Sequence, residues 1–206
     1  MSDLTVGDDG VPRCPWPGSD PLYVDYHDRE WGYPVLSDAG LYERVALEGF
    51  QAGLSWITTL RKRDAFREVF AGFDPDTVSR FGDREVRRLL GDARIIRNEA
   101  KIRAAIGNAA RALELSAEFG SVAGFLARYA DFARPAPTSL EDIPAITEAS
   151  KELSKDLKGR GWSFVGPTTM YALMQAVGLV NDHLDGCQAR ATSEERRRAW
   201  RSVQAS

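Results

Sequence analysis

The sequence has 206 residues, of which 43% are hydrophobic and 28% are charged, which suits one folded domain with a real core. Two cysteines exclude a disulfide-based scaffold, and no apolar run approaches the roughly 18–20 residues of a membrane span. With a net charge of −3, binding to nucleic acid would need a locally basic face. The first 13 residues are polar and acidic and do not resemble a secretory signal, so we expect a cytoplasmic protein with no membrane partner.

Capping residues and apolar spacing predict helices through the first half of the chain. Asp20 precedes a proline and can start a helix that runs to about Trp31. Ser37 can cap a second helix that ends near the glycines at 49 and 53, and a third should cover about residues 54–70. Asn98 precedes apolar residues near the 3.6-residue period, which predicts a long helix up to about position 113.

The second half follows the same pattern. Ser121 can cap a helix through Phe132, and three prolines make residues 134–144 a loop. Thr147 can begin a further helix, and apolar residues at i, i+3, i+4 and i+7 from Met170 predict another that ends at Gly178. Alternating runs of Val, Ile or Thr, which are typical of strands, are absent from the sequence. The predicted fold class is therefore all-α.

All the cysteines and histidines of the chain are Cys14, His27, His183 and Cys187, which form one pair near each end. His183 and Cys187 are four residues apart, so one helical turn could direct both side chains to a single point. Two thiolates and two imidazoles suit the tetrahedral preference of Zn²⁺, and a closed four-ligand site is structural. The spacing alone leaves zinc binding and four ordinary residues about equally favoured.

Aromatic residues crowd the predicted first helix and its surroundings. They are Trp16, Tyr23, Tyr26, Trp31 and Trp56. Core packing is the usual role of such residues, but rings with hydroxyl or indole groups also suit a pocket for a flat heterocycle. Glu48 lies among apolar residues and must be paired, solvated or functional, and a solvated helix position is the simplest interpretation.

A glycine turn at Phe164–Thr169 separates two amphipathic helices. Such a turn presents free backbone N–H groups at a helix N-terminus, where a phosphate can bind. Lysines at 151, 155 and 158 lie just upstream. Most turns of this kind are simple connections, so the motif alone is weak.

Short blocks that occur together in one order cover about residues 13–187. They are Arg13-Cys14 with Trp16, Asp20-Pro21-Leu22-Tyr23, Tyr26-His27-Asp28, Glu30-Trp31-Gly32, Leu47-Glu48-Gly49, Gln51-Ala52-Gly53-Leu54-Ser55-Trp56-Ile57-Thr58, Ile95-Ile96-Arg97, Lys101-Ile102, Ile106-Gly107-Asn108-Ala109, Phe164-Val165-Gly166, Met174-Gln175-Ala176 and Gly178-Leu179-Val180-Asn181-Asp182-His183. In this order the blocks resemble the DNA-3-methyladenine glycosylase I (Tag) family of base-excision repair.

The resemblance implies a helix–hairpin–helix DNA glycosylase fold in which structural Zn²⁺ joins the N- and C-terminal segments. The implied zinc ligands are Cys14, His27, His183 and Cys187. The implied base-binding residues are Trp16, Tyr23, Tyr26 and Trp56, and Glu48 faces the base as the catalytic residue. The implied DNA-binding residues are Leu54, which would enter the duplex, and Gly166 and Thr168 of the hairpin. We expect residues 1–12 to be a flexible extension, residues 13–190 the glycosylase domain and residues 191–206 a flexible basic tail.

The implied reaction is hydrolysis of the N-glycosidic bond of 3-methyladenine in double-stranded alkylated DNA, which releases the free base and leaves an abasic site. Many related glycosylases carry a catalytic Asp where this chain has Asn181, and no lysine suggests a lyase step. The expected enzyme is therefore monofunctional, and we expect it to be a monomer. Two alternatives stay open: a non-catalytic reader of alkylated DNA with the same fold, and a zinc-stapled helical module that does not bind DNA. A base-release assay distinguishes the enzyme from the non-catalytic reader. Salt-dependent duplex binding distinguishes both of these from a module that does not bind DNA.

Overall fold

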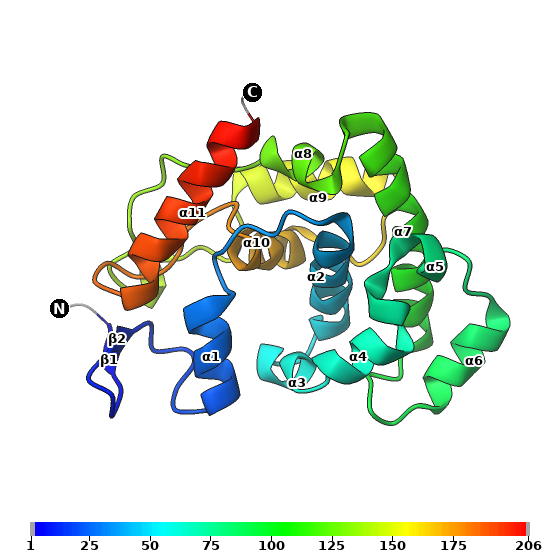
Figure 1. Cartoon of the computed structure of the whole chain (residues 1–206), viewed down its shortest axis with the longest axis horizontal. Helices are drawn as coiled ribbons and strands as arrows, with labels where there is room; N and C mark the ends of the chain where they lie inside the picture. The colour runs from blue at the N-terminus through cyan, green and yellow to red at the C-terminus, as the bar shows by residue number, and fades with distance from the viewer. Residues whose placement is uncertain (1–2, 205–206) are drawn as a thin grey trace.

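The computed structural model describes residues 3–204 and is built mostly of helices (Figure 1). The strands are β1 (Thr5–Val6) and β2 (Pro12–Arg13), and the helices are α1 (Pro21–Arg29), α2 (Asp38–Gln51), α3 (Trp56–Leu60), α4 (Arg63–Val69), α5 (Pro75–Val78), α6 (Asp83–Gly91), α7 (Glu99–Phe119), α8 (Val122–Ala127), α9 (Glu148–Gly159), α10 (Pro167–Ala176) and α11 (Gln188–Gln204). Two 3₁₀ turns, η1 (Ala71–Phe73) and η2 (Leu140–Asp142), connect them. No helix in the described range is long and apolar enough to cross a membrane.

The predicted helix starts are confirmed where a capping side chain marks them. Asp20 Oδ1 accepts a hydrogen bond from the backbone N–H of Leu22 at 3.0 Å, at the start of α1. Ser37 Oγ accepts one from Gly40 at 3.2 Å and Asn98 Oδ1 accepts one from Lys101 at 3.1 Å. Each of these bonds satisfies an N–H group that the helix itself leaves unpaired.

Other boundaries differ from the predictions. The predicted helix over 54–70 is two helices, α3 and α4, which are separated at Arg61 and Lys62. Helix α8 ends at Ala127 and not at Phe132. Short helices α5 and α6 were not predicted. Helix α5 is only four residues long, and α6 has an apolar stripe at i, i+3 and i+4 (Val86, Leu89 and Leu90) that the sequence reasoning overlooked.

The N-terminal segment adds a small departure from an all-α fold. Strands β1 and β2 pair antiparallel, with Thr5 opposite Arg13. The Arg13 guanidinium holds the hairpin to α1, because its Nε donates to Asp28 Oδ2 at 2.9 Å while its Nη2 donates to Asp9 Oδ2 at 2.7 Å. The predicted flexible extension over 1–12 therefore contains hydrogen-bonded structure within its described part.

The predicted flexible tail is wrong as far as residue 204, because residues 188–204 form helix α11. Ala189, Ser193, Arg197 and Trp200 recur every three or four positions and are buried along one face. Because this face includes Ser193 and Arg197, it does not appear apolar in the sequence. Arg197 is nevertheless 2% exposed, and its guanidinium donates to the backbone carbonyls of Gly178, Leu179 and Asp131. The remaining arginines of α11 account for its solvated appearance.

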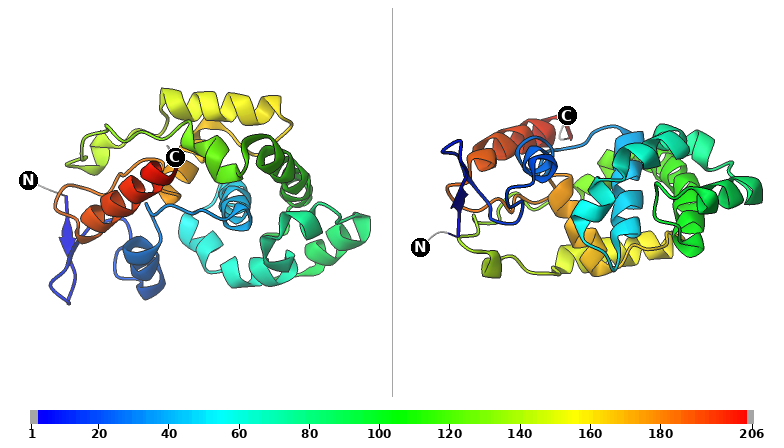
Figure 2. Two further views of the ribbon diagram at one scale, coloured as in Figure 1. Left: turned by 45° about the horizontal axis from the view of Figure 1, so that its top comes forward. Right: turned by 90° about the horizontal axis from the view of Figure 1, so that it is seen from below.

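Helix α2 runs through the centre of the molecule and packs against α7 and α10 (Figure 1). Its middle is buried over a full run from Leu41 to Phe50, which places Glu48 in the interior. The hairpin, α1 and α11 lie together at one end of the molecule, whereas α4 to α7 lie at the other (Figures 1 and 2). The N-terminal hairpin and α1 therefore lie beside the C-terminal helix α11.

Candidate functional site

A cavity of about 290 Å³ lies where α1, α2 and α10 meet. Each of these helices contributes two residues that are three positions apart, and so on one face of its helix. The lining residues are Tyr23 and Tyr26 from α1, Glu48 and Gln51 from α2, Ala172 and Gln175 from α10, together with Trp16, Trp31, Trp56, Leu140 and Ile143. The cavity is large enough for a small flat ligand, and five of its eleven lining residues are aromatic.

The structure brings the four predicted base-binding residues and Glu48 into this one lining. Trp16 packs edge-on against Tyr23, with ring centroids 4.9 Å apart, and Tyr26 tilts against Trp56 at 5.4 Å. Trp56 is 9% exposed and its indole Nε1 has no hydrogen-bond partner within the described chain. The aromatic residues therefore form the walls of the cavity.

Sequence reasoning missed the two glutamines of the lining. Gln51 is one helical turn beyond Glu48, and Gln175 comes from a segment more than one hundred residues away. The spacing of three from Glu48 could have indicated Gln51. No local signal pointed to Leu140 and Ile143, which come from the proline-rich loop.

Glu48 is the unusual ionisable group of the cavity. Its residue is 4% exposed, and no hydrogen bond or ion pair links its side chain to any residue in the described range. Burial raises the pKa of Glu48 from 4.5 to about 8, against the opposing effect of Arg44 one turn earlier. Arg44 Nη2 donates to Glu30 at 2.5 Å, whereas its buried Nη1 has no hydrogen-bond partner in the described part of the chain and makes no bond to Glu48. The carboxyl group therefore lacks the partner that a buried acid normally has.

The two tyrosines respond to the same environment. Burial raises the pKa of Tyr23 and of Tyr26, and the nearby Glu48 charge adds to the rise in both. Both phenols consequently keep their protons near neutral pH and can donate hydrogen bonds into the cavity.

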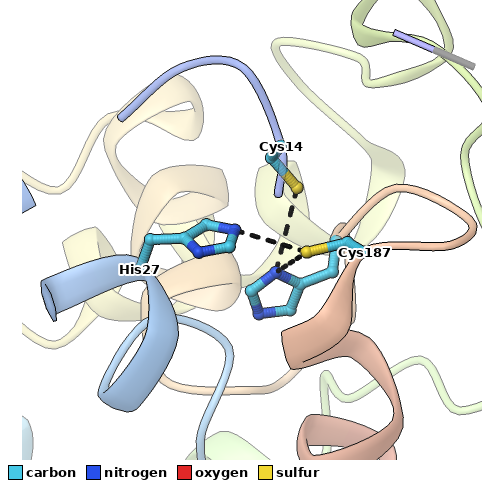
Figure 3. A group of neighbouring side chains, drawn as sticks. Cys14, His27 and Cys187 are labelled. Atoms are coloured by element: carbon cyan, nitrogen blue, oxygen red, sulfur yellow. Dashed lines mark hydrogen bonds between the residues drawn. The ribbon is translucent and has the colours of Figure 1, made fainter. Parts of the chain in front are cut away.

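Next to the cavity, the four predicted metal ligands meet in one buried cluster, of which Figure 3 labels Cys14, His27 and Cys187. The ligand atoms of Cys14, His27, His183 and Cys187 all lie within 4.8 Å of one another. Cys187 Sγ lies 3.5 Å from His27 Nε2 and 3.7 Å from His183 Nδ1, and Cys14 Sγ lies 3.9 Å from the same Nδ1. Residues from the two ends of the chain thus form a set that could hold a metal ion.

Outer contacts orient both imidazoles towards the sulfur atoms. His27 Nδ1 lies 2.7 Å from Asp28 Oδ1, and His183 Nε2 lies 3.0 Å from the carbonyl oxygen of Trp31. Each of these nitrogens donates its proton outward, so the other nitrogen of each ring presents a lone pair to the cluster. Asp28 is in turn held by Arg13, which carries the orientation back to the N-terminal hairpin.

The predicted hairpin connects α9 to α10 and is exposed at its tip. Phe164 is 39% exposed and has a φ of 58°, while Gly166 is the N-cap of α10 with an ordinary φ of −63°. A Cβ at Gly166 would meet no atom within 4 Å, so that side of the turn is open. Thr168 is exposed in the first turn of α10, which has no side-chain cap and whose first N–H groups lack intrahelical acceptors. Ser154 Oγ donates to the Val165 carbonyl at 2.6 Å and holds the turn against α9.

Leu54 occupies a second exposed turn, between α2 and α3. It is 44% exposed and follows Gly53, whose φ of 83° lets the chain reverse after α2. Lys101 Nζ donates to the carbonyls of Phe50 and Ala52, at 2.9 and 2.6 Å, and fixes the start of this turn. The turn therefore presents an apolar side chain from a fixed base.

Asn181 lies outside the cavity lining. It is 2% exposed, and its Nδ2 donates to Glu194 Oε2 at 3.2 Å and to the Arg190 carbonyl at 3.3 Å, both on α11. Asn181 therefore holds the C-terminal helix and does not contribute to the cavity lining.

Residues 16–191 match the model of the methyladenine glycosylase family. The chain is 47% identical over 177 residues to DNA-3-methyladenine glycosylase 1 of Escherichia coli (strain K12), which covers 85% of this chain and 95% of that protein. A crystal structure of 3-methyladenine DNA glycosylase I superposes with a TM-score of 0.82 at 46% identity and covers 86% of this chain and 99% of that one. A single-residue variant of 3-methyladenine DNA glycosylase I in complex with 3-methyladenine superposes with a TM-score of 0.81 at 32% identity and covers 86% and 97% of the two chains.

Proposed function

The chain belongs to the methyladenine glycosylase family, and we propose that the cavity between α1, α2 and α10 is where it binds 3-methyladenine. The protein is a DNA-3-methyladenine glycosylase, a monofunctional hydrolase that cleaves the N-glycosidic bond of the damaged base in alkylated DNA. The products are the free base and an abasic site.

The observation that carries this assignment is the unpaired, buried carboxyl group of Glu48 among aromatic rings. An adenine methylated at N3 in DNA carries a positive charge, whereas ordinary adenine is neutral. The cationic base supplies the partner that Glu48 lacks, and the aromatic faces add cation–π attraction. Neutral adenine offers neither gain, so charge is the basis of selection.

The positive charge also weakens the glycosidic bond, so the departing base needs little protonation. The role of Glu48 is then to bind and stabilise the cationic base, in its ionised form. Because the pKa of Glu48 is about 8 in the empty site, binding of the cation near neutral pH releases a proton from this carboxyl group. The cavity lining contains no lysine, so it offers no amine for a covalent lyase step.

Duplex DNA is proposed to bind across the two exposed turns. Leu54 is suited to fill the space that an extruded base leaves in the stack, since it is apolar, exposed and held at its base by Lys101. Gly166 and Thr168 are suited to grip a phosphate, because Gly166 is open and α10 begins there with free N–H groups. The α9–turn–α10 unit is then the hairpin of a helix–hairpin–helix fold.

Structural zinc is proposed for the Cys14, His27, His183 and Cys187 cluster. Two thiols and two imidazoles are the donors that Zn²⁺ prefers, and the protons of both rings are directed outward by Asp28 and the Trp31 carbonyl. All four residues are buried, which suits a closed site that holds the chain ends together. When bound, zinc supplies folding energy and no chemistry to the reaction.

The deciding experiment is release of free 3-methyladenine from methylated duplex DNA by the purified protein, compared with Glu48→Ala. We expect release by the wild type, with the protein acting as a monomer because the cavity and cluster are complete within one chain. Duplex binding without release would instead indicate a reader of alkylated DNA, which no feature of the cavity favours. Absence of salt-dependent duplex binding would overturn the proposed DNA surface.

A further inference from the structure

Asp182 is a buried carboxylate that accepts hydrogen bonds from three side chains. It is 1% exposed, and its Oδ1 accepts from Arg134 Nε at 2.8 Å. Its Oδ2 accepts from Tyr171 Oη at 2.6 Å and from Gln175 Nε2 at 2.9 Å. None of the residues proposed above for catalysis or DNA binding is in this network.

Gln175 connects the network to the cavity, because it is itself a lining residue. A carboxylate only accepts hydrogen bonds, so the amide of Gln175 must direct its NH₂ group towards Asp182. The amide is planar, which turns its carbonyl Oε1 to the opposite side. Across residues 3–204, no hydrogen bond to this oxygen is formed, so it is available to a ligand.

From this arrangement we propose that Asp182 is a positioning residue that makes Gln175 a hydrogen-bond acceptor in the base pocket. Gln175 Oε1 accepts a hydrogen bond from the exocyclic amino group of the bound base, and so selects a purine with an amino group over one with a carbonyl at that position. The proposal rests on the base-binding function proposed above for the cavity. It adds a criterion for the ligand that is separate from the charge selected by Glu48.

Because Arg134 fixes one oxygen of Asp182, the orientation of the Gln175 amide depends on the other, Asp182 Oδ2. In an Asp182→Asn variant, the amide oxygen must stay towards Arg134, because a guanidinium has only donors. The new NH₂ group then takes the place of Oδ2 and faces Tyr171 and Gln175. The Tyr171 hydroxyl can rotate to accept, whereas Gln175 must turn its amide over and present NH₂ to the cavity.

The test measures the Kd of free 3-methyladenine and of free 3-methylhypoxanthine, which has a carbonyl in place of the amino group. Wild type should prefer 3-methyladenine, and Gln175→Met should reduce that preference by about tenfold. Asp182→Asn should reduce it at least as far, through tighter binding of 3-methylhypoxanthine as well as weaker binding of 3-methyladenine. Asp156→Asn is the matched control, because Asp156 also accepts from a tyrosine, Tyr129, but lies outside the cavity lining.

If Asp182 had a purely structural role, Asp182→Asn would weaken the binding of both bases alike and leave the ratio of their Kd values unchanged. That result would overturn the proposal. An unchanged ratio in Gln175→Met would overturn it even if Asp182→Asn failed to fold. Wild-type protein that binds neither base would instead contradict the proposed function of the cavity. The same ratio shift in Asp156→Asn would show that the measurement does not report on Gln175.

Discussion

The indole ring of Trp16 packs edge-on against the imidazole of His27, with ring centroids 5.1 Å apart. Trp16 lines the cavity, whereas His27 belongs to the metal-ligand cluster and is fully buried. A second contact runs from the His183 imidazole to Trp31, which also lines the cavity, at 4.7 Å. The cluster therefore supports one wall of the cavity directly, so the candidate metal ligands and the pocket are linked through packing.

The first prediction concerns removal of the metal. Cys14→Ser should lower the free energy of unfolding by about 3–5 kcal/mol, because four buried ligands lose the ion that joins the chain ends. The affinity for the free base should change less than the stability, since the cluster reaches the cavity through apolar wall residues such as Trp16 and Trp31 and includes none of the polar lining residues. Chemical denaturation with and without a chelator, together with metal analysis, measures both effects. Carefully purified wild-type protein with well under one zinc per chain would contradict the assignment.

Much of the fold could be predicted because capping signals are local. The starts of α1, α2, α7, α8, α9 and α10 were each marked by a capping side chain or by apolar spacing, and the structure places helices there. Helix α11 was missed because its buried face contains Ser193 and Arg197, so its period is hidden in a hydropathy pattern. Burial of Arg197 depends on three backbone carbonyls from segments up to 66 residues away, which no local pattern reports.

A second prediction follows from that contact. Arg197→Met should destabilise the protein by about 2–4 kcal/mol, because it leaves the buried carbonyls of Gly178 and Leu179 without their donor. The neighbouring Arg198→Met is the matched control, since the Arg198 side chain is 77% exposed, and it should change stability by less than about 0.5 kcal/mol. Thermal unfolding of the two variants makes the comparison. Equal melting temperatures would mean that α11 is not anchored through Arg197.

The candidate site was predictable in its chemistry but not in its full lining. Trp16, Tyr23, Tyr26, Trp56 and Glu48 lie within about forty residues of one another, and all of them line the cavity. The contribution of α10 was hidden, because Ala172 and Gln175 lie between core residues of the same helix. A helix that is buried on several sides has apolar residues on each of them, so its sequence does not show which face meets a cavity. That depends on how the helices pack.

The third prediction tests the hairpin as a phosphate-binding element. Gly166→Val should weaken duplex binding by about tenfold regardless of sequence, because its side chain would occupy the open side of the turn where a phosphate would approach. The fold should persist, since φ at Gly166 is −63° and a Cβ there meets nothing within 4 Å. Gly91→Val, at a similarly unobstructed glycine on α6, should bind as wild type. Salt-dependent binding titrations and circular dichroism compare the two variants, and unaltered affinity in Gly166→Val would make the turn a simple connector.

The fourth prediction concerns pH and the stability of the free protein. The pKa of Glu48 is raised to about 8 in the fold but returns to 4.5 on unfolding, so the folded state holds an extra proton between these values. Stability should therefore fall as the pH rises from about 4.5 to about 8, by an amount of up to about 5 kcal/mol. Glu48→Gln removes this loss, so its melting temperature should exceed that of wild type by more at pH 8 than at pH 5. A difference that is constant across this range would place Glu48 in a solvated or paired environment.

The final prediction separates catalysis from binding at Glu48. Glu48→Gln keeps the shape and part of the hydrogen bonding but removes the charge that the cationic base would meet in a poorly solvated site. A charge-assisted hydrogen bond contributes roughly 1.5–3 kcal/mol, so single-turnover excision should fall about ten- to a hundredfold, and Glu48→Ala should fall at least as far. Binding of free 3-methyladenine should weaken in both variants. The loss should stay well below that of removing an essential nucleophile, because the glycosidic bond is already labile.

Wild-type excision should also rise with pH towards 8 as the carboxyl group ionises, whereas Glu48→Gln should show a flat profile in the same range. Wild-type rates and affinities in both variants would leave selection of the damaged base to the aromatic walls alone.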